Sequence, residues 1–573
     1  MNVKSSSTIL EPLSFNQFKK EVLHDYKIAV ISRECSLIGR REVLTGKAKF
    51  GIFGDGKEVP QLAMAKAFKK GDFRSGYYRD QTFMLAIGEL TPQQFFAGLY
   101  AHTDINADPM SGGRQMGGHF ATHSLDENGH FKSLTEQYNS SGDISPTASQ
   151  MPRLLGLAYA SKLFRNLSEI KNSKFSNNGN EISWGTIGNA STSEGIFFET
   201  INAAGVLQVP MVISVWDDAF GISVPAKYQT TKENISEILK GFQRNNNADG
   251  YEIFVVEGWD YPQLIDVYSR ASKIAREKHV PVLIHVENLT QPQGHSTSGS
   301  HERYKTKERL TWEKQNDCIV KMRDWIIEFD FNDENNNTLK FIDSEEELIK
   351  IEKDAKKEVG QARKDAWNAF LNPLKEEKTI LLNIIENLSL KSTHKAFILK
   401  LKNDLVSILE PSRKDILVTA RKVIVYVRNE KLVEKTQLQN WITNYIKTKQ
   451  PEYSSHLYSQ SDKKVSLSKE VLPTYNKNAE LVDARIIIKE NFDTLFSKYN
   501  NVFIFGEDAG NIGDVNQGLV GLQEKYGELR ITDTGIREAT IIGQGIGMAL
   551  RGLRPIAEIQ YLDYLLYGIQ ILS

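Results

Sequence analysis

The chain has few of the features that mark secreted or membrane proteins. Its 573 residues include only two cysteines, Cys35 and Cys318, which is too few for a disulfide framework or a cysteine-ligated zinc site. No segment approaches the roughly 18 uninterrupted apolar residues of a transmembrane helix, and the N-terminus has no apolar run of signal-peptide length. These absences predict a soluble chain in the cytoplasm, where thiols stay reduced.

The chain also lacks an excess of charge of either sign. Lys and Arg total 71 against 72 Asp and Glu, a net charge of −1. Nothing in this balance favours binding to nucleic acid or to an anionic membrane. Any phosphate group must therefore be recognised by a local site. The length predicts about three to five domains with sizeable buried cores.

Strands and helices alternate in the first half of the chain. The apolar run 209–216 has the length and composition of a strand covered on both faces, and 194–208 has helical spacing. Further strands are expected at 182–188, 253–257 and 280–287, with a helix through 267–275. Together with a helical N-terminal arm, these elements predict an α/β domain over residues 1–330, built on a doubly wound, mostly parallel sheet.

The composition shifts near residue 333 and again near 484. Long Lys/Glu-rich stretches with apolar residues at helical intervals predict a helical spacer over 331–480. A second α/β pattern fills 481–573, with strands near 501–510, 528–535 and 555–560 and a helix over 537–552. Small residues on one side of that helix predict close packing on a sheet. We therefore expect two doubly wound modules joined by a helical linker, the second module being incomplete.

Polar residues follow two neighbouring strands of the first module. Gly188-Asn189-Ala190 ends one strand, and Asp217-Asp218 ends the next. A crossover helix between them returns the chain, so both turns should reach the same edge of the sheet. Asn189 and Asp218 could then bind one Mg²⁺, which accepts few protein carboxylates and completes its shell with phosphate and water. The alternative is that Asn, Asp and Gly simply terminate strands.

The wider sequence around these residues resembles a known cofactor motif. GNASTSEG (188–195), FETINAA (198–204) and WDDAFGISVP (216–225) resemble the thiamine-diphosphate motif. The closest resemblance is to the decarboxylating component of 2-oxoacid dehydrogenase complexes, especially the branched-chain type. YYRDQ (77–81), SGGRQMGGHF (111–120) and QGHSTSGSHERYK (293–305) support it. The stretches VFIFGEDAG and ITDTGIREATIIGQGIG resemble the β subunit of the same enzyme, so the chain looks like a fused αβ form.

The resemblance implies roles for particular residues. The metal ligands would be Asn189, Asp218 and the carbonyl of Phe220; the family has an acid at the first position and asparagine at the second, so the two residue types are exchanged here. His295 and Glu538 would be catalytic, with Glu538 hydrogen-bonded to the aminopyrimidine ring and Glu507 supporting it. The implied cofactor-binding residues are Tyr78, Arg79, Ser145, Thr147, Gly188, Ala190, Ser191, Gln560 and Tyr564.

Other implied features concern the surroundings of the cofactor. The start of the 194–208 helix would offer free amides to the diphosphate. Trp216 stands where branched-chain relatives carry a diphosphate-binding arginine, and Gly535 where the family commonly has proline. Ser145, Ser149 and Gln150 are the implied ligands of a monovalent cation such as K⁺.

The implied activity is oxidative decarboxylation of a 2-oxoacid, with transfer of the acyl group to the lipoyl group of a dihydrolipoyl acyltransferase. Branched-chain acids are preferred over pyruvate, and fused chains are expected to form homodimers. The β subunit's catalytic histidine is expected beyond Ser573. Two alternatives therefore remain: a catalytically incomplete fragment or assembly partner that binds thiamine diphosphate, and another transketolase-like thiamine enzyme.

Overall fold

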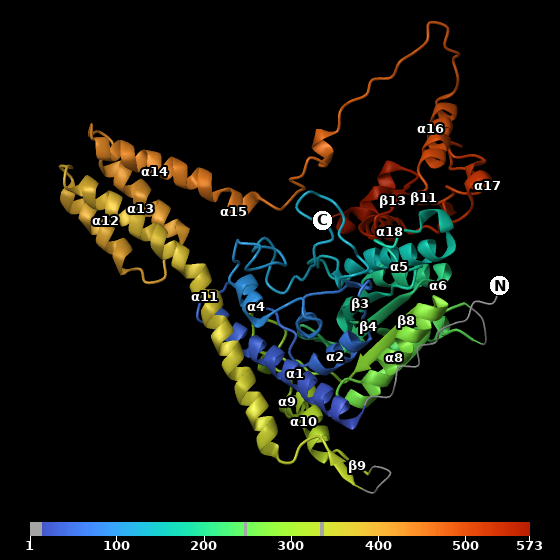
Figure 1. Cartoon of the computed structure of the whole chain (residues 1–573), viewed down its shortest axis with the longest axis horizontal. Helices are drawn as coiled ribbons and strands as arrows, with labels where there is room; N and C mark the ends of the chain where they lie inside the picture. Colours follow the sequence, from blue (N-terminus) through green and yellow to red (C-terminus); the bar gives the residue numbers. More distant parts are fainter. Residues whose placement is uncertain (1–13, 246–248, 333–336, 573) are drawn as a thin grey trace.

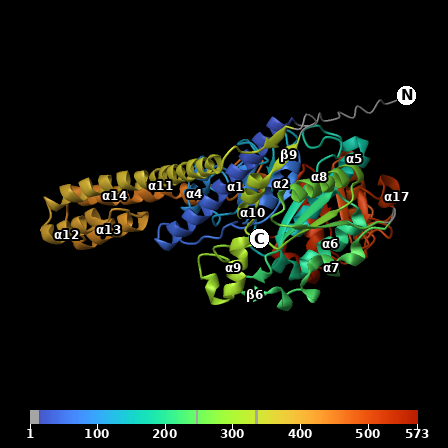
Figure 2. The same ribbon diagram turned by 90° about the horizontal axis from the view of Figure 1, so that it is seen from below.

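The computed structural model describes residues 14–245, 249–332 and 337–572. Residues 1–13, where the expected N-terminal arm begins, lie outside the described residues. Two α/β modules pack against each other, and a bundle of helices projects to one side (Figures 1 and 2). Within the described ranges, no helix combines the length and the apolar character needed to cross a membrane.

The first module is built on a six-stranded sheet in the order β2-β1-β3-β4-β8-β7, in which all paired strands are parallel. This confirms the predicted α/β class and parallel sheet. The strands are β1 (Phe73–Ser75), β2 (Asn139–Ser140), β3 (Ser183–Gly188), β4 (Met211–Trp216), β7 (Glu252–Glu257) and β8 (Val282–Glu287).

Helices cover both faces of this sheet, as the alternation of β4 shows. Met211, Ile213 and Val215 face the core formed with α5 (Gln150–Asn166) and α6 (Gly195–Leu207). Val212 and Trp216 face the opposite core, formed with α1 (Phe15–Leu44), α2 (Glu58–Ala67) and α8 (Tyr261–Lys278). Successive side chains of a strand point to opposite faces, so a fully apolar strand requires two covers.

The long helix α11 (Glu345–Ser389) belongs to two cores. Its first half packs on α1 and on α4 (Pro92–Leu99), and contributes Leu348 and Ala366 to the core of the first module. Its second half forms a separate core with three further helices. Pro373, which interrupts the backbone hydrogen bonds of a helix, lies between the two parts. The three helices are α12 (Lys395–Ser407), α13 (Arg413–Tyr426) and α14 (Val433–Lys449).

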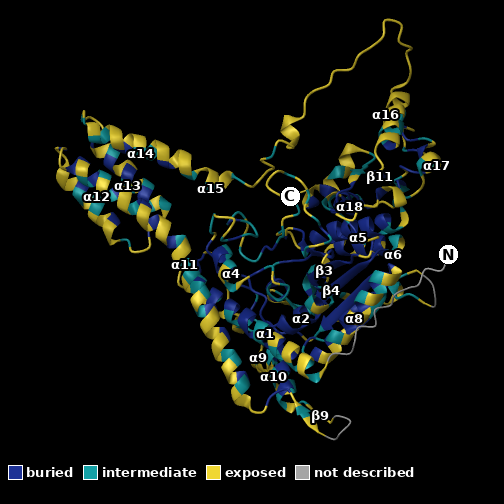
Figure 3. Cartoon of the chain, in the orientation of Figure 1, coloured by how far each residue is buried: buried dark blue, intermediate teal, exposed yellow. Residues whose placement is uncertain are grey.

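An extended segment leads from the bundle to the second module. Residues 462–483 are exposed throughout and arch away from both modules (Figure 3). After α16 (Ala484–Lys498), a parallel sheet in the order β12-β11-β13 forms the core of this module. Its elements are β11 (Val502–Gly506), β12 (Ile531–Asp533), α18 (Glu538–Leu550) and β13 (Arg554–Ala557).

Small residues of α18 set its packing, although the sheet is not their main neighbour. A Cβ atom on Gly545 would lie 3.2 Å from Ala557 of the sheet, as predicted. Gly543 and Gly547 instead face α5, where added Cβ atoms would come within 2.2 Å and 2.3 Å of Pro152 and the Arg153 carbonyl. The two helix backbones therefore approach closely, and the second module packs directly on the first.

Candidate functional site

A cavity of about 410 Å³ opens at the carboxyl ends of β3 and β4. The turns after these parallel neighbours meet there, as the strand–helix–strand pattern predicts. Ten of the fourteen residues predicted to act at the site line it: Tyr78, Arg79, Thr147, Gly188, Asn189, Ala190, Ser191, Asp218, Phe220 and His295.

Of the two adjacent aspartates after β4, only Asp218 lines the cavity. The carboxylate of Asp217 accepts hydrogen bonds from the backbone N–H of Ala219 at 2.7 Å and lies 3.0 Å from Nε2 of the buried His285. Asp217 therefore holds the turn in place. Burial opposes ionisation of Asp218, but the cations Lys57 and Arg79 hold its pKa below the ordinary value. The cavity thus contains a carboxylate that is ionised at neutral pH.

The oxygen atoms around Asp218 suit a small divalent cation. The side chain of Asn189 is bonded to none of the described residues, so its amide oxygen is available to a ligand. Phe220 is paired in a short antiparallel ribbon with Pro225, which has no N–H group to donate to its carbonyl. An amide oxygen, a carboxylate and a carbonyl are the protein ligands that Mg²⁺ accepts.

Arg79 and His295 form a cationic and polar wall of the cavity. The guanidinium of Arg79 donates to the carbonyl oxygens of Phe53 and His295, and to Nδ1 of His295 at 3.0 Å. Because arginine can only donate, Nδ1 must be unprotonated. Burial and the charge of Arg79 lower the pKa of His295 to about 4. His295 is therefore neutral at pH 7, with its proton on Nε2.

The structure adds two cations that were not among the predicted site residues; Lys305 ends the motif QGHSTSGSHERYK, whereas Lys57 lies in none of the motifs. Lys57 lines the cavity, and its ammonium lies 2.9 Å from the Asp218 carboxylate. Lys305 also lines it and is paired with the buried Glu313 at 2.7 Å. Lys57 is thus paired with Asp218 and Lys305 with Glu313, whereas Arg79 donates to no carboxylate among the described residues, so its positive charge is left for an anion. No motif could have indicated Lys57, since Asp218 lies 161 residues away.

The turn after β3 lies on the cavity, through Asn189, Ala190 and Ser191, and the α6 helix does not. The segment Asn189–Ser193 forms a 3₁₀ turn between β3 and α6. Trp216 also lines the cavity, but its indole N–H points to Asp80 at 3.4 Å, so it replaces an arginine with no cation.

Four predicted residues lie outside the cavity. The hydroxyl of Ser145 lies 3.0 Å from Nε2 of His119. Gln560 donates to the carboxylate of Asp508 at 3.0 Å, and the Tyr564 ring packs edge-on against Tyr561. Glu538 is half-buried at the first position of α18.

Glu538 nevertheless lies near the boundary between the modules. Two residues further along α18, the backbone N–H of Thr540 donates to the Glu199 carboxylate of α6 at 2.8 Å. Burial and the charges of Asp508 and Glu538 raise the pKa of Glu507. The start of α18 therefore contacts α6 of the first module.

Comparison with known proteins divides the chain in the same way. Residues 26–372 match the family described as "Dehydrogenase E1 component", and residues 481–573 match "Transketolase, pyrimidine binding domain". These two matches confirm the resemblance to fused α-like and β-like parts.

Individual relatives agree with these family matches. The chain is 27% identical over 285 residues to "2-oxoisovalerate dehydrogenase subunit alpha" of Bacillus subtilis, covering 50% of this chain and 75% of the relative. It is 46% identical over 81 residues to "Pyruvate dehydrogenase E1 component subunit beta" of Acholeplasma laidlawii, covering 14% and 25%. It is 39% identical over 92 residues to "2-oxoisovalerate dehydrogenase subunit beta" of Pseudomonas aeruginosa, covering 16% and 26%. The chain thus spans three quarters of the first relative but about a quarter of each β relative.

Proposed function

Because this chain belongs to the dehydrogenase E1 component family, we propose that it binds thiamine diphosphate and Mg²⁺ and acts in the oxidative decarboxylation of a 2-oxoacid. The observation that carries this proposal is the convergence of Asn189, Asp218, Arg79 and His295 on one cavity. The unpaired charge of Arg79 suits a diphosphate, and the oxygen ligands of the cavity suit the metal.

Particular residues of the chain would have the following roles in binding and catalysis. Asn189, Asp218 and the Phe220 carbonyl would hold Mg²⁺, and Arg79 would bind the diphosphate with a charge-assisted hydrogen bond. His295, neutral and protonated on Nε2, can donate one hydrogen bond to an oxygen in the cavity. When bound, the cofactor supplies a carbon nucleophile and an electron sink. Glu538 would hold a proton at the aminopyrimidine ring, which requires that the cofactor reach from the cavity to α18.

Substrate and partner follow from the relatives. Relatives of both parts of the chain are named 2-oxoisovalerate dehydrogenase subunits, which supports a branched-chain 2-oxoacid such as 3-methyl-2-oxobutanoate over pyruvate. The acyl group would pass to the lipoyl group of a dihydrolipoyl acyltransferase in the cytoplasm, and the fused chain would act as a homodimer. The Ser149 hydroxyl, buried without a hydrogen-bond partner, supports a K⁺ site with Gln150 and Ser145.

The experiment that tests this function measures 2-oxoacid-dependent reduction of lipoamide, with thiamine diphosphate and Mg²⁺ present. Branched-chain acids should be turned over faster than pyruvate, and Glu538→Gln should lower kcat by about 10²-fold or more, since a positioned proton-transfer group contributes 10²–10⁴. Equal activity of Glu538→Gln and the unchanged chain would contradict the role of Glu538.

One observation favours a second function, cofactor binding without turnover. No described residue of 481–573 lines the cavity, so the activating carboxylate is not part of it. In that case thiamine diphosphate would bind tightly to the chain, and neither 2-oxoacid consumption nor lipoamide reduction would follow. A transketolase-type activity is distinguished by using a sugar phosphate donor in the same assay.

A further inference from the structure

Lys57 is a buried lysine whose ammonium group is fully hydrogen-bonded. Only 2% of its side chain is exposed. The ammonium donates to the Asp218 carboxylate at 2.9 Å, to the Thr290 carbonyl at 3.0 Å and to the Gln291 amide oxygen at 2.8 Å. Lysine has three donors, so all are used. A buried charge is costly unless it is paired, and the only carboxylate among these three partners is Asp218.

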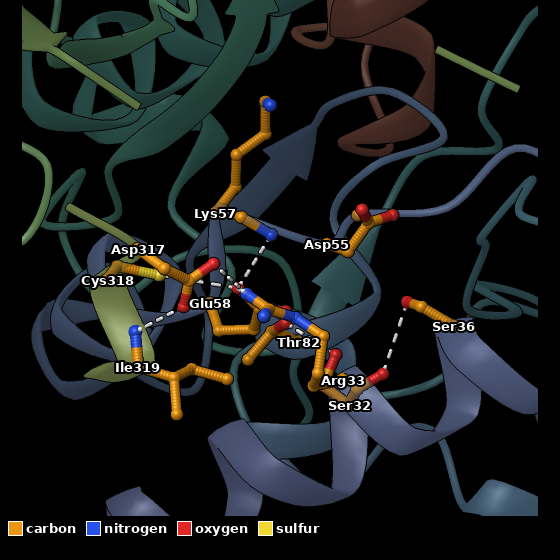
Figure 4. A network of polar contacts seen from close by, with 12 residues as sticks. Ser32, Arg33, Ser36, Asp55, Lys57, Glu58, Thr82, Asp317, Cys318 and Ile319 are labelled. Carbon is orange, nitrogen blue, oxygen red and sulfur yellow. Dashed lines mark hydrogen bonds and ion pairs between the residues drawn. The ribbon is translucent and has the colours of Figure 1, made fainter. Parts of the chain in front are cut away.

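Glu58, the acidic residue next to Lys57 in the chain, does not need it. Glu58 is held by Arg33, whose guanidinium donates to both carboxylate oxygens at 2.7 and 3.0 Å and also reaches Asp317 at 2.9 Å. Figure 4 shows this cluster, with the side chain of Lys57 extending away from it. The ammonium of Lys57 therefore interacts with groups at the cavity and not with the cluster of Arg33, Glu58 and Asp317.

Lys57 changes what Asp218 can offer to a metal. One carboxylate oxygen accepts the ammonium of Lys57, and the other accepts the backbone N–H of Phe220 at 3.1 Å. Each oxygen keeps a further lone pair, so coordination remains available. The negative charge that attracts a divalent cation, however, is already balanced by the hydrogen-bonded ammonium group of Lys57.

We propose that Lys57 is a built-in cation of the diphosphate site, which lets the chain bind the diphosphate group without metal and weakens its affinity for metal alone. This inference rests on the proposed function, because it concerns the same cofactor. The physical reason is the charge of the cavity. With Lys57 the Asp218 centre is neutral and Arg79 attracts the anion; without Lys57 the carboxylate repels the anion and attracts the metal.

Removal of the lysine charge should therefore have effects of opposite sign on the two ligands. For Lys57→Met, the affinity for inorganic diphosphate and for thiamine diphosphate in EDTA should fall about tenfold or more, since a unit charge near an anion in a partly buried site is worth at least that much. The affinity for Mg²⁺ or Mn²⁺ alone should rise. Isothermal titration calorimetry measures all three, and Mn²⁺ binding can also be followed by electron paramagnetic resonance.

Two further variants distinguish the effect of the Lys57 charge on ligand affinity from an effect on folding. Lys57→Gln keeps hydrogen-bonding groups at this position without the charge, and should behave as Lys57→Met does. Lys66→Met removes a lysine at the other end of the same helix, paired with Asp25 at 3.1 Å and outside the cavity, and should leave all three affinities unchanged. Thermal melts of each variant verify that it is folded.

The outcomes separate this inference from the proposed function. Weaker diphosphate binding with tighter metal binding supports the role of Lys57. Unchanged diphosphate binding in folded Lys57→Gln overturns it, as does a parallel loss of both ligands, which indicates a structural role only. If the unchanged chain binds inorganic diphosphate but not thiamine diphosphate, the proposed function fails while the role of Lys57 is still decided by the diphosphate titrations.

Discussion

At the scale of single residues, two adjacent acidic side chains in this chain have different roles. Asp217 and Asp218 are adjacent, yet one positions a turn and the other faces the cavity. The motif in the sequence indicated Asp218, and the structure gives the reason: Asp217 is occupied by the Ala219 N–H and by His285. Lys57 could not be predicted in this way, because its partners Asp218, Thr290 and Gln291 are distant in sequence.

A second residue-scale feature is the acidic group at the end of β13. Burial and the charges of Asp514, Glu507 and Asp508 raise the pKa of Glu558 to about 7, and one of its carboxylate oxygens is buried without a hydrogen-bond partner. The folded chain thus binds this proton more tightly than the unfolded chain. The stability it contributes is fully present below about pH 4.5 and is lost as the pH rises through 7.

We therefore predict that Glu558→Gln stabilises the protein at pH 8. The variant should raise the free energy of unfolding there by on the order of 1 kcal/mol, after allowance for solvent screening. The gain should vanish near pH 4. Denaturant unfolding at both pH values tests this, with the exposed Glu524→Gln as the control. A gain of the same size at both pH values would show that the charge of Glu558 is not its cause.

At the scale of elements, the sequence pattern predicted the central strands of the first sheet and the strands of the second module, but not which elements pack against each other. The apolar runs near 209–216 and 280–287 became β4 and β8, and the predicted helix 537–552 became α18. The packing of α18 on α5 depends on Gly156 of one helix meeting Gln544 of the other, where an added Cβ would lie 2.1 Å from the carbonyl oxygen. Such a contact between residues almost 400 positions apart is not visible in local spacing.

We predict that Gly543→Val separates the two helices. The added side chain would meet Pro152 of α5, and overpacking of this kind costs about 1–3 kcal/mol. Gly360→Ala is the matched control, because a Cβ on this glycine of α11 meets nothing within 4 Å. That variant should gain about 0.5–1 kcal/mol from helix propensity. Equal thermal stability of Gly543→Val and the unchanged chain would contradict the close packing.

At the scale of the whole molecule, the two modules are joined by a spacer but held together by their interface. Arg551 after α18 is buried and donates to Glu181 of the first module at 2.8 Å. One core cluster also includes residues of both modules, among them Leu155 and Ile541. The sequence predicted two modules and a helical linker. It did not indicate that residues 462–483 contribute little to holding the two modules together.

We predict that the modules stay together after this segment is cut. Limited trypsin digestion should cleave first at the exposed lysines of the segment, Lys463, Lys464, Lys469 and Lys477. The two fragments should elute as one species in size-exclusion chromatography, because the contact between α5 and α18 remains. Combining cleavage with Gly543→Val should make them separate more readily. Fragments that separate from the unchanged chain would refute the proposed interface.

The central claim is that the cavity at the ends of β3 and β4 is a thiamine diphosphate site centred on Asp218. The most direct measurement is calorimetric titration of the 573-residue chain with thiamine diphosphate in the presence of Mg²⁺. One cofactor should bind per chain, and Asp218→Ala should weaken this binding by removing the increase in affinity that Mg²⁺ provides. Glu257→Gln, which changes a carboxylate at the end of β7 outside the cavity, should bind normally. Unchanged affinity in Asp218→Ala would contradict the account.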